Sequence, residues 1–177
     1  WSRRLFYGIK RGQRGEFIAG NIRSCLYRPF QRSNVYYQKQ FNDEQGRLPK
    51  IFPEPDTQNL VITVSGVGAR SGASVFMANC MPDRQLVDNG QCFPLKLYEQ
   101  HEGDADGLFA NEAEDGLRET DGITDEGLQH FLDAYPGESL SKEDLFYYVY
   151  GLLHSTEYRD RFANNLSKEL PRIPAVK

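Results

Sequence analysis

The sequence predicts an α+β fold in which a strand-rich N-terminal sheet is followed by a three-helix C-terminal layer. Strand-forming runs fall within residues 25–98, where β-branched and aromatic residues are frequent. Apolar residues recur at helical spacing after residue 122, and a strongly acidic segment separates the two patterns. We therefore divide the chain into a basic strand-rich part (1–98), an acidic mobile insertion (99–121) and a helical part (122–177).

The clearest strand is Leu60–Ser65, whose β-branched run predicts burial on both faces. Residues Ile22–Gln38 predict a strand, a turn and a second strand, because Pro29 disfavours a helix and Val35 to Tyr37 are strand formers. Further strands are predicted at Ser74–Ala78 and Phe93–Tyr98, and Leu5–Tyr7 is a candidate start of a strand near the N-terminus.

Proline and glycine mark the loops of this part. Asp43–Asp56 contains three prolines and is predicted to be a loop. The glycines that follow Ser65 are typical of a tight turn that presents Arg70, because the GK[ST] ending of a phosphate loop is missing. Residues 10–15, KRGQRG, are either a flexible basic loop that contacts phosphate or a solvated linker.

Three helices are expected near residues 124–135, 142–154 and 156–169, with Thr124 and Ser141 as N-caps. Pro171 ends the last helix, since proline lacks the backbone N–H and has a restricted φ. The residues predicted to be buried on these helices are Leu128, Phe131, Val149, Leu152, Phe162 and Leu166.

The net charge of −4 conceals a strong asymmetry. Residues 1–50 hold eleven Lys/Arg against three acidic residues, a net charge of +8, and the remaining 127 residues carry −12. Within the latter, residues 99–121 contain nine acidic residues and a single arginine, a composition that predicts a mobile, dispensable insertion. The asymmetry predicts that the N-terminal half faces a polyanion.

Other features of the composition limit the classes of protein to which the chain can belong. The three cysteines are widely spaced without a CxxC pair, so we expect reduced thiols in a cytoplasmic protein. The three histidines show no ligand spacing, and no metal site is expected. No apolar run approaches the length of a membrane helix, so no membrane association is expected, and the start at Trp1 suggests a fragment of a longer polypeptide.

Several short motifs occur in a distinctive order. YRPF (27–30) is followed by VYY (35–37), FPL (93–95), YGLLHS (150–155) and LPRIP (170–174). In this order the chain resembles the C-terminal target-recognition region of type ISP restriction-modification enzymes, which are single-polypeptide and ATP-dependent, and of related adenine-specific DNA methyltransferases.

The resemblance implies sequence-specific recognition of double-stranded DNA as the non-catalytic part of such a polypeptide. Its partners would be DNA and the upstream methyltransferase and helicase parts. The parent would use S-adenosylmethionine, ATP and Mg, but no cofactor is expected in this chain. Its sequence contains no [DN]PP[YF] loop, no (D/E)xK nuclease triplet and no helicase phosphate loop, so we expect no catalysis.

Arginine side chains are the main candidates for contacts with DNA, because a guanidinium matches both phosphate and guanine. Arg70 is the candidate for base readout. Arg28 is either a DNA contact or an internal brace bonded to carbonyl groups. The resemblance implies that the YRPF motif occurs in domains that recognise different DNA sequences, so we do not expect it to contact bases, and the brace is favoured. The full set of predicted DNA-binding residues is Arg11, Arg14, Arg28, Arg32, Tyr36, Arg47 and Arg70.

Two hypotheses follow. In the first, the domain recognises a DNA target. In the second, it is a structural coupling module, whose helices bind the methyltransferase and whose basic half binds DNA without reading it. The ratio of cognate to non-specific affinity at fixed salt distinguishes them.

Overall fold

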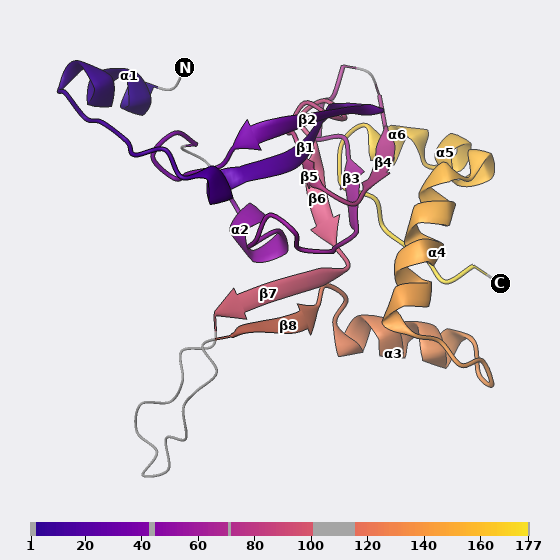
Figure 1. Cartoon of the computed structure of the whole chain (residues 1–177). Helices are drawn as coiled ribbons and strands as arrows, with labels where there is room; N and C mark the ends of the chain where they lie inside the picture. The colour runs from indigo at the N-terminus through magenta and orange to yellow at the C-terminus, as the bar shows by residue number, and fades with distance from the viewer. Residues whose placement is uncertain (1–2, 43–44, 71, 101–115, 177) are drawn as a thin grey trace, which may run out of the picture.

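The computed structural model describes residues 3–42, 45–70, 72–100 and 116–176. Strands and helices are mixed, with most strands in the N-terminal part and the helices α3 to α6 at the C-terminal end, which confirms the predicted α+β class (Figure 1). The strands are β1 (Ile22–Arg28), β2 (Gln31–Tyr36), β3 (Val61–Val64), β4 (Val75–Ala78), β5 (Met81–Pro82), β6 (Gln91–Pro94), β7 (Lys96–Gln100) and β8 (Leu117–Asp121). The α-helices are α1 (Arg3–Lys10), α2 (Leu48–Ile51), α3 (Asp125–Ala134), α4 (Lys142–His154), α5 (Thr156–Arg161) and α6 (Ala163–Leu166).

The strands form three small sheets where the sequence analysis expected one. The first has the order β2-β1-β5, the second β4-β3-β6, and the third is the hairpin β7-β8. Only the β1–β5 pairing is parallel, and it spans two residue pairs. The predicted strand Phe93–Tyr98 is two strands, because the chain leaves β3 after Pro94 and pairs with β8 from Lys96 onward.

Strand β3 lies between two hydrophobic cores, which confirms its predicted burial on both faces. Val61 belongs to a core with residues of β1, α2 and β5. Ile62 and Val64 belong to a second core with Phe146 and Leu153 of α4. Because successive side chains of a strand point to opposite faces, this one strand joins the strand-rich part to the helical part.

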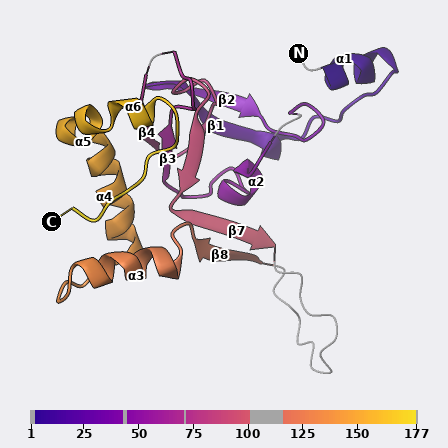
Figure 2. The same ribbon diagram turned by 180° about the vertical axis from the view of Figure 1, so that it is seen from behind.

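The helical layer is close to the prediction, with one break. Thr124 and Ser141 cap α3 and α4 through their side-chain oxygens, and Asp144 completes a capping box on α4. The third predicted helix is divided into α5 and α6 at Phe162, whose backbone is not helical (φ −110°, ψ 18°). The proline-bounded tail after α6 runs back along α4, where the hydroxyl of Tyr148 donates to the carbonyl of Pro174 at 2.7 Å (Figures 1 and 2).

The predicted buried positions on these helices were only partly right. Phe131 is buried, whereas Leu128, Val149, Leu152, Phe162 and Leu166 are half-buried. The fully covered positions are instead Leu145, Phe146, Leu153 and Tyr158. Helix α4 is apolar around most of its circumference, so its sequence did not show which stripe faces β3.

Two segments near the N-terminus differ from the prediction. Leu5–Tyr7 lies in helix α1, and in both views α1 is far from the sheets, so no strand is available to pair with it (Figures 1 and 2). The predicted loop Asp43–Asp56 contains the short helix α2, which has Pro49 in its first turn. Proline is well tolerated there because the first N–H groups of a helix have no intrahelical partner.

The acidic segment also requires a correction. Residues 99–100 and 117–121 were assigned to the mobile insertion, but they lie in β7 and β8, which pair in the register Lys96↔Asp121 to Gln100↔Leu117. Acidic side chains stabilise this hairpin because cations lie opposite them, which composition alone did not reveal. The prediction of mobility for residues 101–115 lies outside the described residues.

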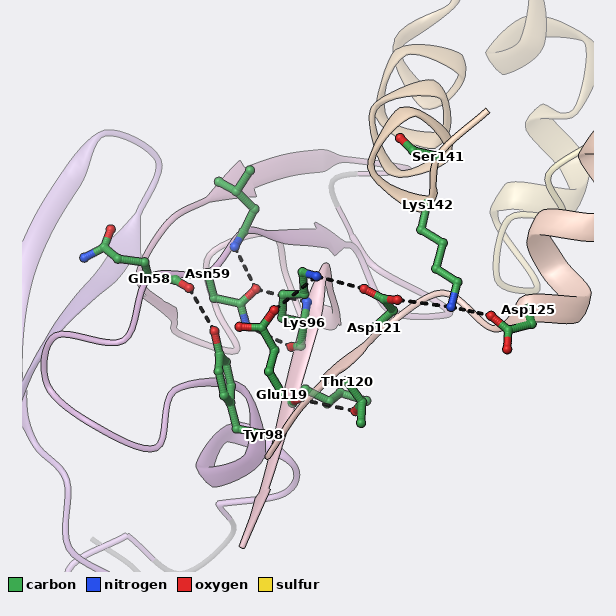
Figure 3. A network of polar contacts seen from close by, with 12 residues as sticks. Gln58, Asn59, Lys96, Tyr98, Glu119, Thr120, Asp121, Asp125, Ser141 and Lys142 are labelled. Atoms are coloured by element: carbon green, nitrogen blue, oxygen red, sulfur yellow. Dashed lines mark hydrogen bonds and ion pairs between the residues drawn. The ribbon is translucent and has the colours of Figure 1, made fainter. Parts of the chain in front are cut away.

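An ion-pair network holds the hairpin against the helical layer (Figure 3). The ammonium of Lys96 lies 2.8 Å from Asp121 and 3.1 Å from Glu119, and the ammonium of Lys142 lies 3.1 Å from Asp121 and 2.5 Å from Asp125. Hydrogen bonding to Lys96, and then to Lys142, lowers the pKa of Asp121. Asp121 therefore links β7 to the start of α4.

Candidate nucleic-acid interface

Three of the predicted arginines lie at one end of the molecule, which we call the basic end (Figure 1). This end consists of the β1–β2 turn, the loop 65–74 between β3 and β4, and the loop 83–90 between β5 and β6. Arg28 comes from the end of β1, Arg32 from the start of β2 and Arg70 from the loop 65–74. All three side chains are exposed. Residues 17–42, which include the β1–β2 hairpin, contain no aspartate or glutamate.

Arg28 makes the contact expected of an internal brace. Its guanidinium donates to the carbonyl oxygen of Gln85 at 2.5 Å and stacks over the ring of Tyr27, 4.6 Å from the ring centroid. These contacts connect the β1–β2 turn to the loop 83–90. The structure therefore shows the bond to a backbone carbonyl that the brace predicts, and a contact between the exposed Arg28 side chain and DNA stays a prediction.

Arg32 is positioned by a polar contact from the neighbouring strands. Its guanidinium donates to Oδ1 of Asn79 at 2.5 Å, in the turn between β4 and β5. The side chain remains exposed, and a guanidinium has five N–H donors. Arg32 can therefore keep its contact with Asn79 and still donate to a phosphate.

The loop 65–74 is held mainly through its backbone. Asp88 accepts from the backbone N–H of Arg70 at 2.7 Å, and its carbonyl accepts from Gly66 at 3.1 Å. The guanidinium of Arg159 on α5 donates to the carbonyl of Ala73 at 2.7 Å. A Cβ at Gly66 would lie 2.5 Å from the backbone oxygen of Asn89, so this position requires glycine. The loop is therefore ordered at its ends and presents the Arg70 side chain outward.

Arg11 and Arg14 lie apart from the basic end, in the N-terminal arm (residues 3–21). Both side chains are exposed. The arm reaches the body at Tyr36, whose hydroxyl accepts from the N–H of Ile18 at 3.0 Å and whose ring stacks on Phe17, with centroids 5.4 Å apart. Tyr36 thus has a structural role that the sequence did not indicate, and its contact with DNA remains a prediction.

Arg47 belongs to neither group. It precedes α2 and lines a mainly apolar cavity of about 420 Å³ between β3, β6, α4 and the C-terminal tail. Cys92 also lines this cavity, and burial raises the pKa of its thiol to about 12. The thiol is therefore protonated at neutral pH and is a poor nucleophile.

The sequence analysis missed Phe30, which follows Pro29 at the tip of the β1–β2 turn. Its side chain is 91% exposed, and its backbone is left-handed with a φ of +64°. A left-handed conformation is rare for a bulky residue and costs free energy. Pro29 was a signal for the turn, but no sequence signal indicated that the following aromatic would be exposed.

Within the described ranges, no group of three or more His, Cys, Asp or Glu side chains is arranged to hold a metal ion. In the same residues, no helix combines the length and apolar character needed to cross a membrane.

Comparison with protein families decides the assignment. The model of the type ISP C-terminal specificity domain matches residues 1–177. The chain belongs to this family. The match covers the whole chain and confirms the resemblance inferred from the YRPF, FPL and LPRIP motifs. A comparison with curated proteins found no match.

Solved structures agree with the type ISP assignment. The chain is 30% identical to the ATP-dependent type ISP restriction-modification enzyme LlaBIII bound to DNA, with a TM-score of 0.81 over 100% of this chain. It is 31% identical to DrdV in a DNA complex, with a TM-score of 0.86 over 99% of the chain. A nuclease-deletion mutant of the type ISP enzyme LlaGI, in complex with a DNA substrate mimic, is 30% identical with a TM-score of 0.73 over 98% of the chain. The chain spans only 11%, 16% and 14% of the lengths of these proteins.

Proposed function

We propose that this type ISP specificity domain recognises a DNA target sequence on behalf of a longer restriction-modification polypeptide. The observation that carries the proposal is its match over nearly its full length to domains of proteins solved with DNA. The basic end supports it independently, because it presents the exposed side chains of Arg32 and Arg70 from a hairpin and a neighbouring loop.

Recognition of a duplex requires contacts of two kinds. Arg32 on β2 and Arg11 and Arg14 on the N-terminal arm are suited to phosphates, because they are exposed and lie in a region with few acids. Arg70 is suited to a base edge, because the loop that carries it is held at its backbone and leaves the side chain free to enter a groove.

We assign catalysis to the remainder of the polypeptide. Methyl transfer with S-adenosylmethionine and ATP-driven steps with Mg would belong to those parts, and this chain would act by positioning them on a target. A cytoplasmic location follows from that role, since the DNA substrate is there. None of the sequence motifs for these reactions occurs in the chain.

The test compares Arg70→Ala with Arg14→Ala in the intact polypeptide. Arg70→Ala should weaken cognate binding by about 1–3 kcal/mol and relax specificity at one base position. Arg14→Ala should weaken binding to cognate and random DNA alike and reduce the salt dependence of both. Kd values measured by fluorescence anisotropy at several salt concentrations give both quantities.

The coupling module remains the second candidate. One observation favours it: the N-terminal arm exposes Phe6, Ile9 and Phe17, at 47%, 50% and 68%, as expected of a surface that another part of the polypeptide covers. Equal weakening of both DNAs by Arg70→Ala would support this candidate over base readout.

A further inference from the structure

The exposed aromatic at the tip of the β1–β2 turn has no role in the fold that would explain its position. Phe30 is 91% exposed, so its ring contributes almost nothing to either hydrophobic core. Its φ of +64° adds a conformational cost that glycine or asparagine at the same position would avoid. The left-handed backbone closes the turn between the paired residues Arg28 and Gln31, but the fold does not use the aromatic side chain. This indicates that the ring acts on something outside the described chain.

The ring is nevertheless held in place. It meets the ring of Phe76 on β4 edge to face, with centroids 5.5 Å apart and an interplanar angle of 75°. Below the tip, Arg28 ties the turn to the carbonyl of Gln85, and Arg32 ties the start of β2 to Asn79. Phe30 is thus held on a braced hairpin. Inserting its ring into a binding partner would therefore cost little additional conformational entropy.

The charge around the ring identifies its partner. Arg28 and Arg32 lie two residues before and after Phe30, and the whole stretch 17–42 lacks an acidic side chain. Arg70 lies in the loop beside the same turn (Figures 1 and 2). An exposed apolar ring flanked along the chain by two arginines, on a stretch without acidic residues, matches a nucleic acid, in which stacked bases lie between two rows of phosphates.

We propose that Phe30 is a wedge that inserts into the DNA base stack or stacks on an unpaired base, while Arg32 contacts a neighbouring phosphate. The proposal rests on the DNA-binding function proposed above and adds a deformation of the duplex to it. A ring face stacks on any base, so this role does not depend on the target sequence.

The experiment uses the intact polypeptide and duplexes that contain its recognition sequence, with 2-aminopurine placed singly at successive positions. Binding of the unaltered protein should raise 2-aminopurine fluorescence at one step, because unstacking relieves quenching. Phe30→Ala should abolish that rise and weaken binding about tenfold, an effect within the range for loss of one stacked base. Phe30→Trp should retain both the rise and the affinity.

Matched controls separate the possible outcomes. Tyr147→Ala removes another exposed aromatic, on α4, and should change neither signal. If Phe30→Ala leaves the fluorescence rise intact, the wedge is refuted. If it also lowers the thermal transition of the intact polypeptide, Phe30 packs against another protein part instead. If the unaltered protein shows no preference for its target over random DNA, the proposed function fails before the wedge is tested.

Discussion

Asn59 joins three segments of the fold through a single side chain. Its amide donates to the carbonyls of Ile51 and Lys96 at 3.0 and 2.9 Å. Its oxygen accepts from the N–H groups of Leu60 and Lys96 at 2.9 and 3.1 Å. The residue is 8% exposed, and Ile51 is 2% exposed, so water has little access to these groups.

We expect Asn59→Ala to lower the free energy of unfolding by about 3 kcal/mol. The carbonyl of Ile51 would be left buried without its partner, at about 1–3 kcal/mol. The backbone groups of Leu60 and Lys96 are half-buried, so water would replace part of what they lose. For a domain of this size, the loss corresponds to a fall in Tm of about 6–12 °C. Urea unfolding followed by circular dichroism measures it.

Two variants test the reasoning behind this value. Asn59→Asp keeps the acceptor oxygen but replaces the donating amide with an oxygen that faces two carbonyls, so it should destabilise at least as much as Asn59→Ala. Gln58→Ala is the control, because the amide of Gln58 is exposed and its change should stay within about 0.5 kcal/mol. A loss below about 1 kcal/mol for Asn59→Ala would refute the argument that these bonds hold α2 and β7 on β3.

Three further predictions concern capping, acid stability and thiol reactivity. Ser141→Ala should cost about 1 kcal/mol in urea unfolding, because it breaks the capping box of α4. The pKa of Asp121 is lowered in the folded state, so its contribution is present above its unfolded pKa of about 4 and is lost as pH falls through the lower folded value. As the pH falls below about 4, the Tm of Asp121→Asn should therefore decrease less steeply than the Tm of the unaltered protein. Cys92, with its pKa raised to about 12, should resist iodoacetamide at pH 8 until the chain unfolds, as mass spectrometry would show.

The sequence was most informative where one local pattern decides the structure. The β-branched run at β3 and the caps Thr124 and Ser141 depend on neighbouring residues, and all were predicted correctly. The burial of α4 depends on which of several apolar faces meets β3, so only the packed structure distinguished Leu145 and Phe146 from Val149 and Leu152.

The net charge of the N-terminal half likewise did not show which arginines form the candidate interface. Arg23 contributes to the +8 of the first fifty residues, yet it is 8% exposed and donates to the carbonyl of Pro53 at 3.1 Å. Arg28 also donates to a backbone carbonyl, but its side chain stays exposed. Composition predicts that a region is basic, but which arginines remain available to a ligand depends on long-range contacts.

The way the loop 65–74 is attached has a consequence for how this domain can change its target. Its holding contacts use the backbone N–H of Arg70 and the backbone carbonyl of Ala73, together with the steric requirement for glycine at position 66. Every residue type except proline supplies both of these backbone groups. Side chains at the loop's tip can therefore be exchanged without loss of its support, provided that Ser65, Asp88 and Arg159 are retained. New specificities become accessible by substitution on an unchanged frame.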